Sequence, residues 1–246
     1  MDLSMKRLLT ALLVLLVFCA EARAATPAVT TGAGYMKMVQ ELAAAYKSDT
    51  GKQVQEVYGG NIGQMLAQIE AGNGVNVVIS DKGALKTAKS DVRIAKMQPL
   101  GATVLVLAWR KGIELSSPND LTGDKVKSVA YPDPKAAIYG RAAAKYLETT
   151  GLGAKIAPKV SQVSTVPQVF SYLVSGEMDA GFVNRVVARA GKDKIGGSLE
   201  IPSGYPPIEM VAAVVEGAEN DPAVADFLKF LGGNRAGAIM KKHGVQ

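Results

Sequence analysis

The segment YGGNIGQMLAQIEAG, residues 58–72, joins a glycine-rich turn directly to the start of an amphipathic helix. Its apolar residues recur at the spacing of one helix face, and they are Ile62, Met65, Leu66 and Ile69. Gly72 follows them and is a typical helix end. The first turn of a helix has backbone N–H groups without internal partners and a partial positive charge. Glycines before it let another group approach the backbone closely. The segment therefore predicts a place where an anion can bind.

Two interpretations of this turn stay open when it is taken alone. Asn61 can simply cap the helix while the glycines make the turn, or the free N–H groups can hold a ligand. A similar construction recurs at residues 32–35, 135–138 and 164–168. In the last of these, Pro167 suits the first helical position, where its missing N–H costs nothing. Four such helix starts in one chain favour a shared anion site.

The N-terminal residues are typical of a signal peptide. Lys6 and Arg7 precede an apolar run, residues 8–20, and residues 22–24 have the small-x-small pattern of a cleavage site. We expect residues 1–24 to be removed during export to the periplasm. The net charge then falls from +6 to +5, because three basic and two acidic side chains are lost. A moderately basic chain is compatible with an anionic ligand, although this signal is weak.

The composition of the mature chain excludes several kinds of site. The single cysteine, Cys19, lies in the leader, where lipidation is an alternative to simple cleavage. The mature chain therefore has no disulfide and no thiolate site. The single histidine, His243, is expected to be solvated near the C-terminus. A Ser/His/Asp triad or a catalytic metal site is hard to build from this composition. Basic residues do not gather with aromatic ones as in nucleic-acid-binding proteins.

Strand and helix patterns alternate along the chain, which predicts an α/β fold. The continuous β-branched run at residues 75–79 is typical of a strand in a parallel sheet covered on both faces. Shorter strands are expected at residues 28–31, 54–58, 126–131 and 180–183. Helices are expected at residues 35–46, 62–71, 136–148, 167–173, 221–231 and 235–243. Two long apolar strands, at residues 104–109 and 209–215, are similar in length and character.

Several short passages, taken in order, resemble a known family. They are residues 68–72, 77–80, 136–139, 221–224, 227–231 and 242–244. This collinear set resembles the periplasmic substrate-binding proteins of bacterial ABC importers, and within them the molybdate-binding family. The resemblance extends over nearly the whole mature chain. Its strength lies in the order of the passages and not in any single motif.

The resemblance implies a two-lobed α/β fold of the type II periplasmic binding proteins. Each lobe would be a mostly parallel sheet flanked by helices, with two crossing strands as the hinge. On this pattern the first lobe holds residues 25–103 and 209–246, and the second holds residues 104–208. The two long apolar strands, at residues 104–109 and 210–215, would be the crossings.

The resemblance also implies that main-chain N–H groups and hydroxyls hold a bare tetrahedral oxyanion without a counter-charge. The positions that match the family's ligand contacts are Ala33, Gly34, Asn61, Ile62, Ala136, Ala137, Val166 and Asn184. The usual serines of the first two loops are replaced, in the first by Gly34 and in the second by Asn61 or Ile62. Asn184 replaces a usual tyrosine. Backbone donors survive such changes, so an anion site is expected while the identity of the anion stays open.

We therefore expect the periplasmic substrate-binding component of an ABC transporter, with molybdate or tungstate as the first candidate ligand. Its partners would be this anion and a permease in the inner membrane, without nucleic acid, and it would be a monomer. No catalytic residue, cofactor or metal site beyond the oxyanion contacts is expected. We expect Arg141 and Arg185 to be solvated, with direct pairing to the anion as the alternative.

Three other functions stay open at this point. One is a binding protein of the same fold for sulfate, thiosulfate or a small carboxylate. Another is an exported adhesion or colonisation factor that kept the fold. The third is an enzyme that uses helix starts as an oxyanion site, although the chain shows no recognisable pair of nucleophile and base.

Overall fold

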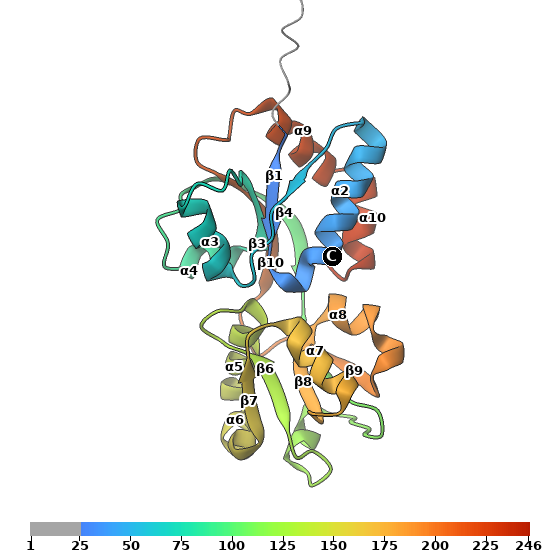
Figure 1. Ribbon diagram of the computed structural model, residues 1–246. Coiled ribbons are helices and arrows are strands. Elements are labelled where there is room, and N and C mark those ends of the chain that lie inside the picture. Colours follow the sequence, from blue (N-terminus) through green and yellow to red (C-terminus); the bar gives the residue numbers. More distant parts are fainter. Residues whose placement is uncertain (1–25) are drawn as a thin grey trace, which may run out of the picture.

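A computed structural model describes residues 26–246 and shows two lobes stacked end to end (Figure 1). Each lobe is built on a five-stranded sheet. The expected leader, residues 1–24 with Cys19, lies outside the described residues. None of the helices within residues 26–246 combines the length and the apolar character that a membrane crossing requires.

The first lobe contains the sheet of order β2-β1-β3-β10-β4. Its strands are β1 (Ala28–Thr31), β2 (Gln55–Glu56), β3 (Val77–Asp81), β4 (Ile94–Thr103) and β10 (Ile208–Val215). Its helices are η1 (Ala33–Tyr35), α2 (Met36–Thr50), α3 (Ile62–Glu70), α4 (Lys82–Thr87), α9 (Pro222–Leu231) and α10 (Asn234–Lys242). α2, α9 and α10 cover one face of the sheet, and α3 and α4 cover the other (Figure 1). The central strands β1 and β3 are therefore buried along their whole length, which accounts for the continuous β-branched run in β3.

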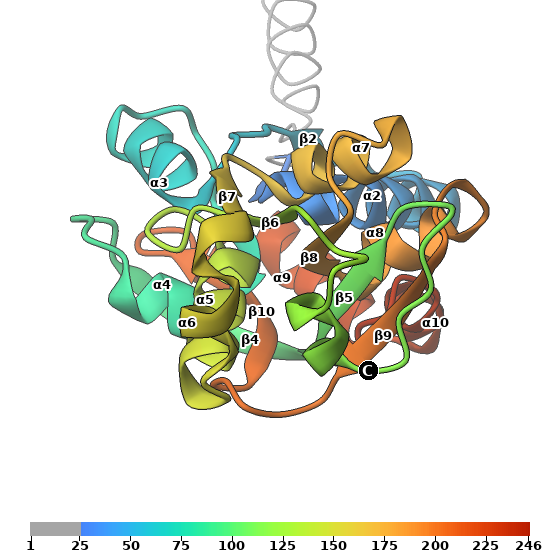
Figure 2. The same ribbon diagram turned by 90° about the horizontal axis from the view of Figure 1, so that it is seen from below.

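The second lobe contains the sheet of order β7-β6-β8-β5-β9. Its strands are β5 (Leu105–Trp109), β6 (Val129–Pro132), β7 (Val160–Val163), β8 (Ala180–Asn184) and β9 (Gly197–Ile201). Its helices are η2 (Pro118–Thr122), α5 (Ile138–Thr149), α6 (Leu152–Ile156), η3 (Ala157–Lys159), α7 (Val166–Ser175), α8 (Arg185–Ala190) and η4 (Lys192–Lys194). Figure 2, with this lobe in front, shows α5 and α6 on one side of the sheet and α7 and α8 on the other.

The two sheets share one topology, in which a single strand runs against the other four. That reversed strand is β10 in the first lobe and β5 in the second, and each enters directly from the opposite lobe. The chain crosses at Val104, between β4 and β5, and again at residues 202–207, between β9 and β10. The structure thus corrects the expected place of the crossings, because the two long apolar strands lie inside the sheets. They are apolar because they are inner strands whose side chains are buried on both faces of the sheet.

Several local expectations also need correction. The helix expected from Ala136 begins at Ile138, because the preceding residues form a turn. The ten-residue edge strand β4 was not expected from the sequence. His243 is not solvated: its side chain is 12% exposed, and its Nε2 lies 2.8 Å from the Oε2 of Glu41 on α2. This contact helps to fix the C-terminal segment against the first lobe.

Candidate functional site

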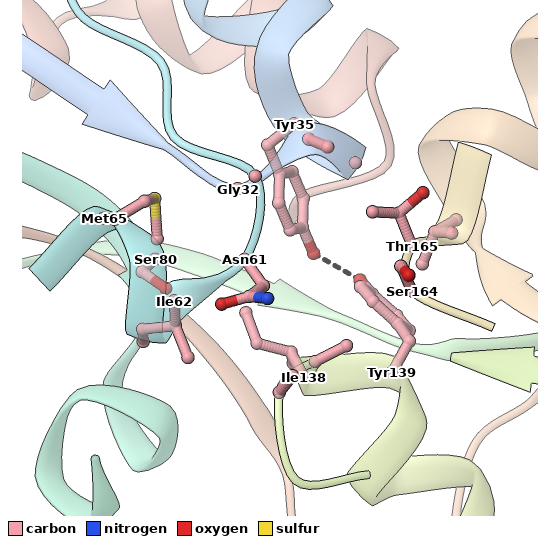
Figure 3. A pocket seen from close by; sticks show the side chains of 16 residues that line it. Gly32, Tyr35, Asn61, Ile62, Met65, Ser80, Ile138, Tyr139, Ser164 and Thr165 are labelled. Carbon is pink, nitrogen blue, oxygen red and sulfur yellow. Dashed lines mark hydrogen bonds between the residues drawn. The ribbon is translucent and has the colours of Figure 1, made fainter. Parts of the chain in front are cut away.

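A small cavity lies where loops of the two lobes meet (Figure 3). Its volume is about 50 Å³, which leaves room for only a few non-hydrogen atoms, since one water molecule needs about 10–15 Å³. The lining residues are Gly32, Ala33, Gly34, Tyr35, Gly60, Asn61, Ile62, Met65, Ser80, Ala136, Ala137, Ile138, Tyr139, Ser164, Thr165 and Val166. None of them carries a charged side chain. Any attraction for an anion must therefore come from hydrogen-bond donors and backbone dipoles.

Two loops of the first lobe form one side of the cavity. The N–H of Ala33 donates to a carbonyl of the neighbouring loop at 3.3 Å and ties the two loops together. Asn61 forms a capping box with Gln64, in which the Asn61 side chain accepts at 3.1 Å and the Asn61 N–H donates at 3.0 Å. The N–H groups of Ala33 and Asn61 are therefore already bonded. Those of Gly34 and Ile62 have no partner among the described residues.

In the third loop, which precedes α5, the free N–H donors do not belong to Ala136 and Ala137, the two residues expected to contact the ligand. Ala136 and Ala137 line the cavity, but both of their N–H groups donate to the carbonyl of Asp133, at 3.1 and 2.9 Å. α5 begins immediately afterwards, and its first N–H groups have no partner within the helix. The donors that this segment can offer to the cavity are therefore the N–H groups of Ile138 and Tyr139, which both line it.

The fourth loop leaves a single donor free at the start of α7. The Thr165 side chain caps this helix by accepting from the N–H of Gln168 at 3.3 Å. Pro167 has no N–H. The N–H of Val166, in the first turn of this helix, therefore has no partner among the described residues, and Val166 lines the cavity.

Asn184 is the only predicted site residue that does not line the cavity. Its side chain is fully buried and both of its polar atoms are used. Its Oδ1 accepts from the N–H of Val187 at 2.8 Å and so caps α8. Its Nδ2 donates to the carbonyl of Gly34 at 3.0 Å, across the junction of the two lobes. Asn184 thus joins the lobes beside the cavity.

A second bond across the lobes forms one wall of the cavity. The hydroxyls of Tyr35, from the first lobe, and Tyr139, from the second, share a short hydrogen bond (Figure 3). Burial raises the pKa of both hydroxyls above the usual value, and the contact with Tyr139 raises the pKa of Tyr35 further. The hydrogen bond with Tyr35 acts in the opposite direction on Tyr139 and lowers its pKa, but burial outweighs it. Both side chains therefore stay neutral at ordinary pH. The sequence predicts that Tyr35 begins a helix, but it does not predict the contact between Tyr35 and Tyr139. A contact between two lobes leaves no local sequence pattern.

Ser80 is a second lining residue that sequence reasoning missed. It ends the apolar run of β3 just before α4, where a serine is more typical of a helix cap than of a ligand contact. The side chain that caps α4 is that of Asp81, which accepts from the N–H of Ala84 at 2.7 Å. Ser80 is 1% exposed, and its hydroxyl has no hydrogen-bond partner among the described residues.

Charged groups lie outside the cavity. Burial raises the pKa of Asp81, which lines a neighbouring hollow together with Arg141. Arg185 is buried, contrary to expectation, because its Nη2 pairs with Glu200 Oε2 at 2.7 Å. It does not line the cavity. The described residues also contain no group of three or more side chains that could hold a metal ion.

The cavity is thus a small space to which each of four loops contributes at least one main-chain N–H without a partner among residues 26–246. These donors include the N–H groups of Gly34, Ile62, Ile138 and Val166. Such groups can replace the water around a negatively charged guest. No carboxylate, imidazole or ammonium lines the cavity to move a proton. The arrangement suits the binding of an anion by hydrogen-bond donors.

Known proteins of similar sequence and structure include binding proteins for small anions. The family model described as bacterial extracellular solute-binding protein matches residues 28–246. A molybdate-binding protein ModA from Azotobacter vinelandii is 26% identical over 250 residues, which are 99% of this chain and 98% of the relative. The solved periplasmic molybdate-binding protein of Azotobacter vinelandii has a TM-score of 0.78 at 24% identity, covering 89% of this chain and 98% of the other. PEB3 from Campylobacter jejuni, solved with L-phospholactate bound, has a TM-score of 0.71 at 18% identity, covering 89% and 98%.

Proposed function

Because the chain belongs to the family of bacterial extracellular solute-binding proteins, we propose that it captures a small oxyanion in the periplasm for an ABC importer. Molybdate and tungstate are the first candidates, since relatives of nearly equal length are molybdate-binding proteins. The chain acts as a binding protein without catalysis and delivers its ligand as a monomer to a permease. Residues 1–24 direct its export. The lobes that close on the ligand are residues 25–103 with 209–246, and residues 104–208.

The observation that carries this proposal is the set of free donors that four loops place around an uncharged cavity. Each hydrogen bond to a charged group contributes about 1.5–3 kcal/mol, so four contribute about 6–12 kcal/mol. Dehydration of the anion offsets part of this sum. Micromolar binding needs about 8 kcal/mol. The main-chain donors alone therefore reach the micromolar range only near the upper end of their contribution, and further donors would strengthen binding.

Contacts between the lobes support closure around the ligand. Two loops with free donors belong to the first lobe and two to the second. A ligand held by all four would therefore bridge the lobes and favour their contact. The Tyr35–Tyr139 and Asn184–Gly34 bonds are contacts that such a closed state makes.

Calorimetry of the mature protein, residues 25–246, with molybdate, tungstate and sulfate tests the function. We expect micromolar or tighter binding of molybdate and tungstate, with weaker binding of sulfate. The permease partner is tested by cross-linking in membranes that contain the importer. If no anion of this panel binds, the proposed ligand class is wrong.

A small organic acid is the second candidate, and a particular feature favours it. A hollow of about 320 Å³ adjoins the cavity, with Ile138 lining both. Its lining includes Arg141, Lys145 and Asp81, and the Arg141 Nη2 is buried without a partner among the described residues. A ligand with two acidic groups could place one in the cavity and the other against this guanidinium. Adding L-phospholactate to the same calorimetric panel separates this candidate from the first.

A further inference from the structure

Ser80 occupies a position in β3 where the pattern of burial calls for an apolar side chain. Side chains two residues apart point to the same face of a strand, so Ser80 shares its face with Val78. Val78 is completely buried and packs in an apolar cluster with Val75, Val211 and Ala213. Ser80 itself is 1% exposed. Its hydroxyl is thus a polar group on the apolar face of a central strand.

This hydroxyl forms no hydrogen bond with any other group of the described protein. The Ser80 Oγ is shielded from solvent and has no hydrogen-bond partner within residues 26–246. A buried hydroxyl without a partner has lost its bonds to water and gained none in return, so it destabilises the fold. Alanine would fill the same place without this cost. The position therefore calls for a partner that the protein chain does not supply.

The surroundings of Ser80 indicate where this partner binds. Ser80 lines the cavity, on the side formed by Ile62 and Met65 (Figure 3). Ile62 also presents one of the free N–H donors. The hydroxyl and this N–H therefore lie on the same side of the cavity and can serve one guest.

We propose that the Ser80 hydroxyl donates a hydrogen bond to an oxygen of the bound anion and is a specificity-determining residue of the site. This inference rests on the proposed function, because it requires an oxyanion in the cavity. Ser80 would supply a side-chain hydroxyl on the first lobe, where the resemblance implies that Gly34 in one loop and Asn61 or Ile62 in the other replace the usual serines. A hydroxyl hydrogen rotates freely about the C–O bond, so it can follow the position of the oxygen.

The test compares Ser80→Ala with a matched control, Thr30→Val. Thr30 lies on the neighbouring strand β1, is also 1% exposed and also has an unpartnered hydroxyl, but it does not line the cavity. Calorimetry with molybdate, tungstate and sulfate measures binding by both variants and by the unchanged protein. Thermal unfolding without anion measures their stability.

We expect Ser80→Ala to weaken binding of the preferred anion by about 10- to 100-fold, the range for one hydrogen bond to a charged group. Its unfolding temperature without anion should equal or exceed that of the unchanged protein, because the unpartnered hydroxyl is gone. Thr30→Val should bind as the unchanged protein does. Equal affinities for Ser80→Ala and the unchanged protein overturn the role of Ser80 alone. Failure of the unchanged protein to bind any of the three anions overturns the proposed function, and with it this inference.

Discussion

Replacing Gly34 by alanine should weaken ligand binding by obstructing the contact between the lobes. A Cβ at this position would lie 2.7 Å from the Nδ2 of Asn184, which belongs to the other lobe. The backbone itself tolerates alanine, because the φ of Gly34 is not positive. The obstruction therefore arises only where the two lobes touch.

The loss of affinity can be estimated from the two hydrogen bonds of the Asn184 side chain that the new Cβ would disturb. Its bond to the Gly34 carbonyl contributes about 0.5–1.5 kcal/mol. Moving its side chain also disturbs the cap of α8, and such caps contribute about 0.5–2 kcal/mol. Together these changes cost the closed arrangement about 1–3 kcal/mol. If ligand binding requires that arrangement, the affinity falls by about 5- to 150-fold.

Calorimetry with molybdate measures the affinity, and small-angle X-ray scattering measures whether the lobes still close with ligand. Gly237→Ala is the matched control, because a Cβ on this residue of α10 meets no neighbouring atom. It should leave binding unchanged. Gly34→Ala should also unfold at nearly the same temperature as the unchanged protein when anion is absent and the lobes can separate. Unchanged affinity in Gly34→Ala would refute the role of this contact in closure.

Two further predictions concern contacts away from the donors. Tyr139→Phe removes the hydroxyl bond to Tyr35 and keeps both rings, so we expect about a 2- to 10-fold loss of anion affinity in the same calorimetric assay; an equal affinity would contradict a role of this bond in closure. Hydrogen bonds from Lys242 and His243 lower the pKa of Glu41 from its usual 4.5. A lowered pKa stabilises the fold above the unfolded value, and the stabilisation is lost as the pH falls through the folded value. Because this carboxylate is partly exposed, we expect Glu41→Gln to cost under about 1 kcal/mol at pH 7 and nothing near pH 2. Thermal unfolding between these pH values measures this, and parallel curves for both proteins would contradict it.

The four loops around the cavity could be located from the sequence because their signals are local. Asn61 before an apolar helix face and Pro167 each indicate a helix start within a few residues, although the structure makes Pro167 the second residue of α7 and not the first. Ala33, Ala136 and Val166 were placed beside a ligand by resemblance, and the structure brings their loops together. The assignment of individual donors depended on turns that the sequence does not fix. The bonds of Ala136 and Ala137 to Asp133 shift the free donors to Ile138 and Tyr139.

Features that depend on distant parts of the chain could not be inferred in this way. The partner of Asn184 is the carbonyl of Gly34, 150 residues earlier in the sequence. The strand-end pattern around Asn184 indicates only that a polar group is present.

The prediction that the two long apolar strands are the crossings between the lobes was wrong for a related reason. A continuous apolar strand indicates burial on both faces, but it does not tell an inner strand of a sheet from a connection between sheets.

The absence of charge in the cavity has a consequence for selectivity among anions. The free main-chain N–H groups at Gly34, Ile62, Ile138 and Val166 can only donate. No carboxylate lines the cavity to accept a hydrogen from the guest. An oxyanion that still carries an O–H would face these donors with its hydrogen unless a hydroxyl oxygen or a main-chain carbonyl accepts it, and an unpaired buried polar group costs about 1–3 kcal/mol. A fully deprotonated oxyanion avoids this cost. The free main-chain N–H groups thus favour fully deprotonated anions such as molybdate, tungstate and sulfate over protonated phosphate. On the proposed function, the choice among those three anions depends on the size of the cavity and on side chains such as Ser80.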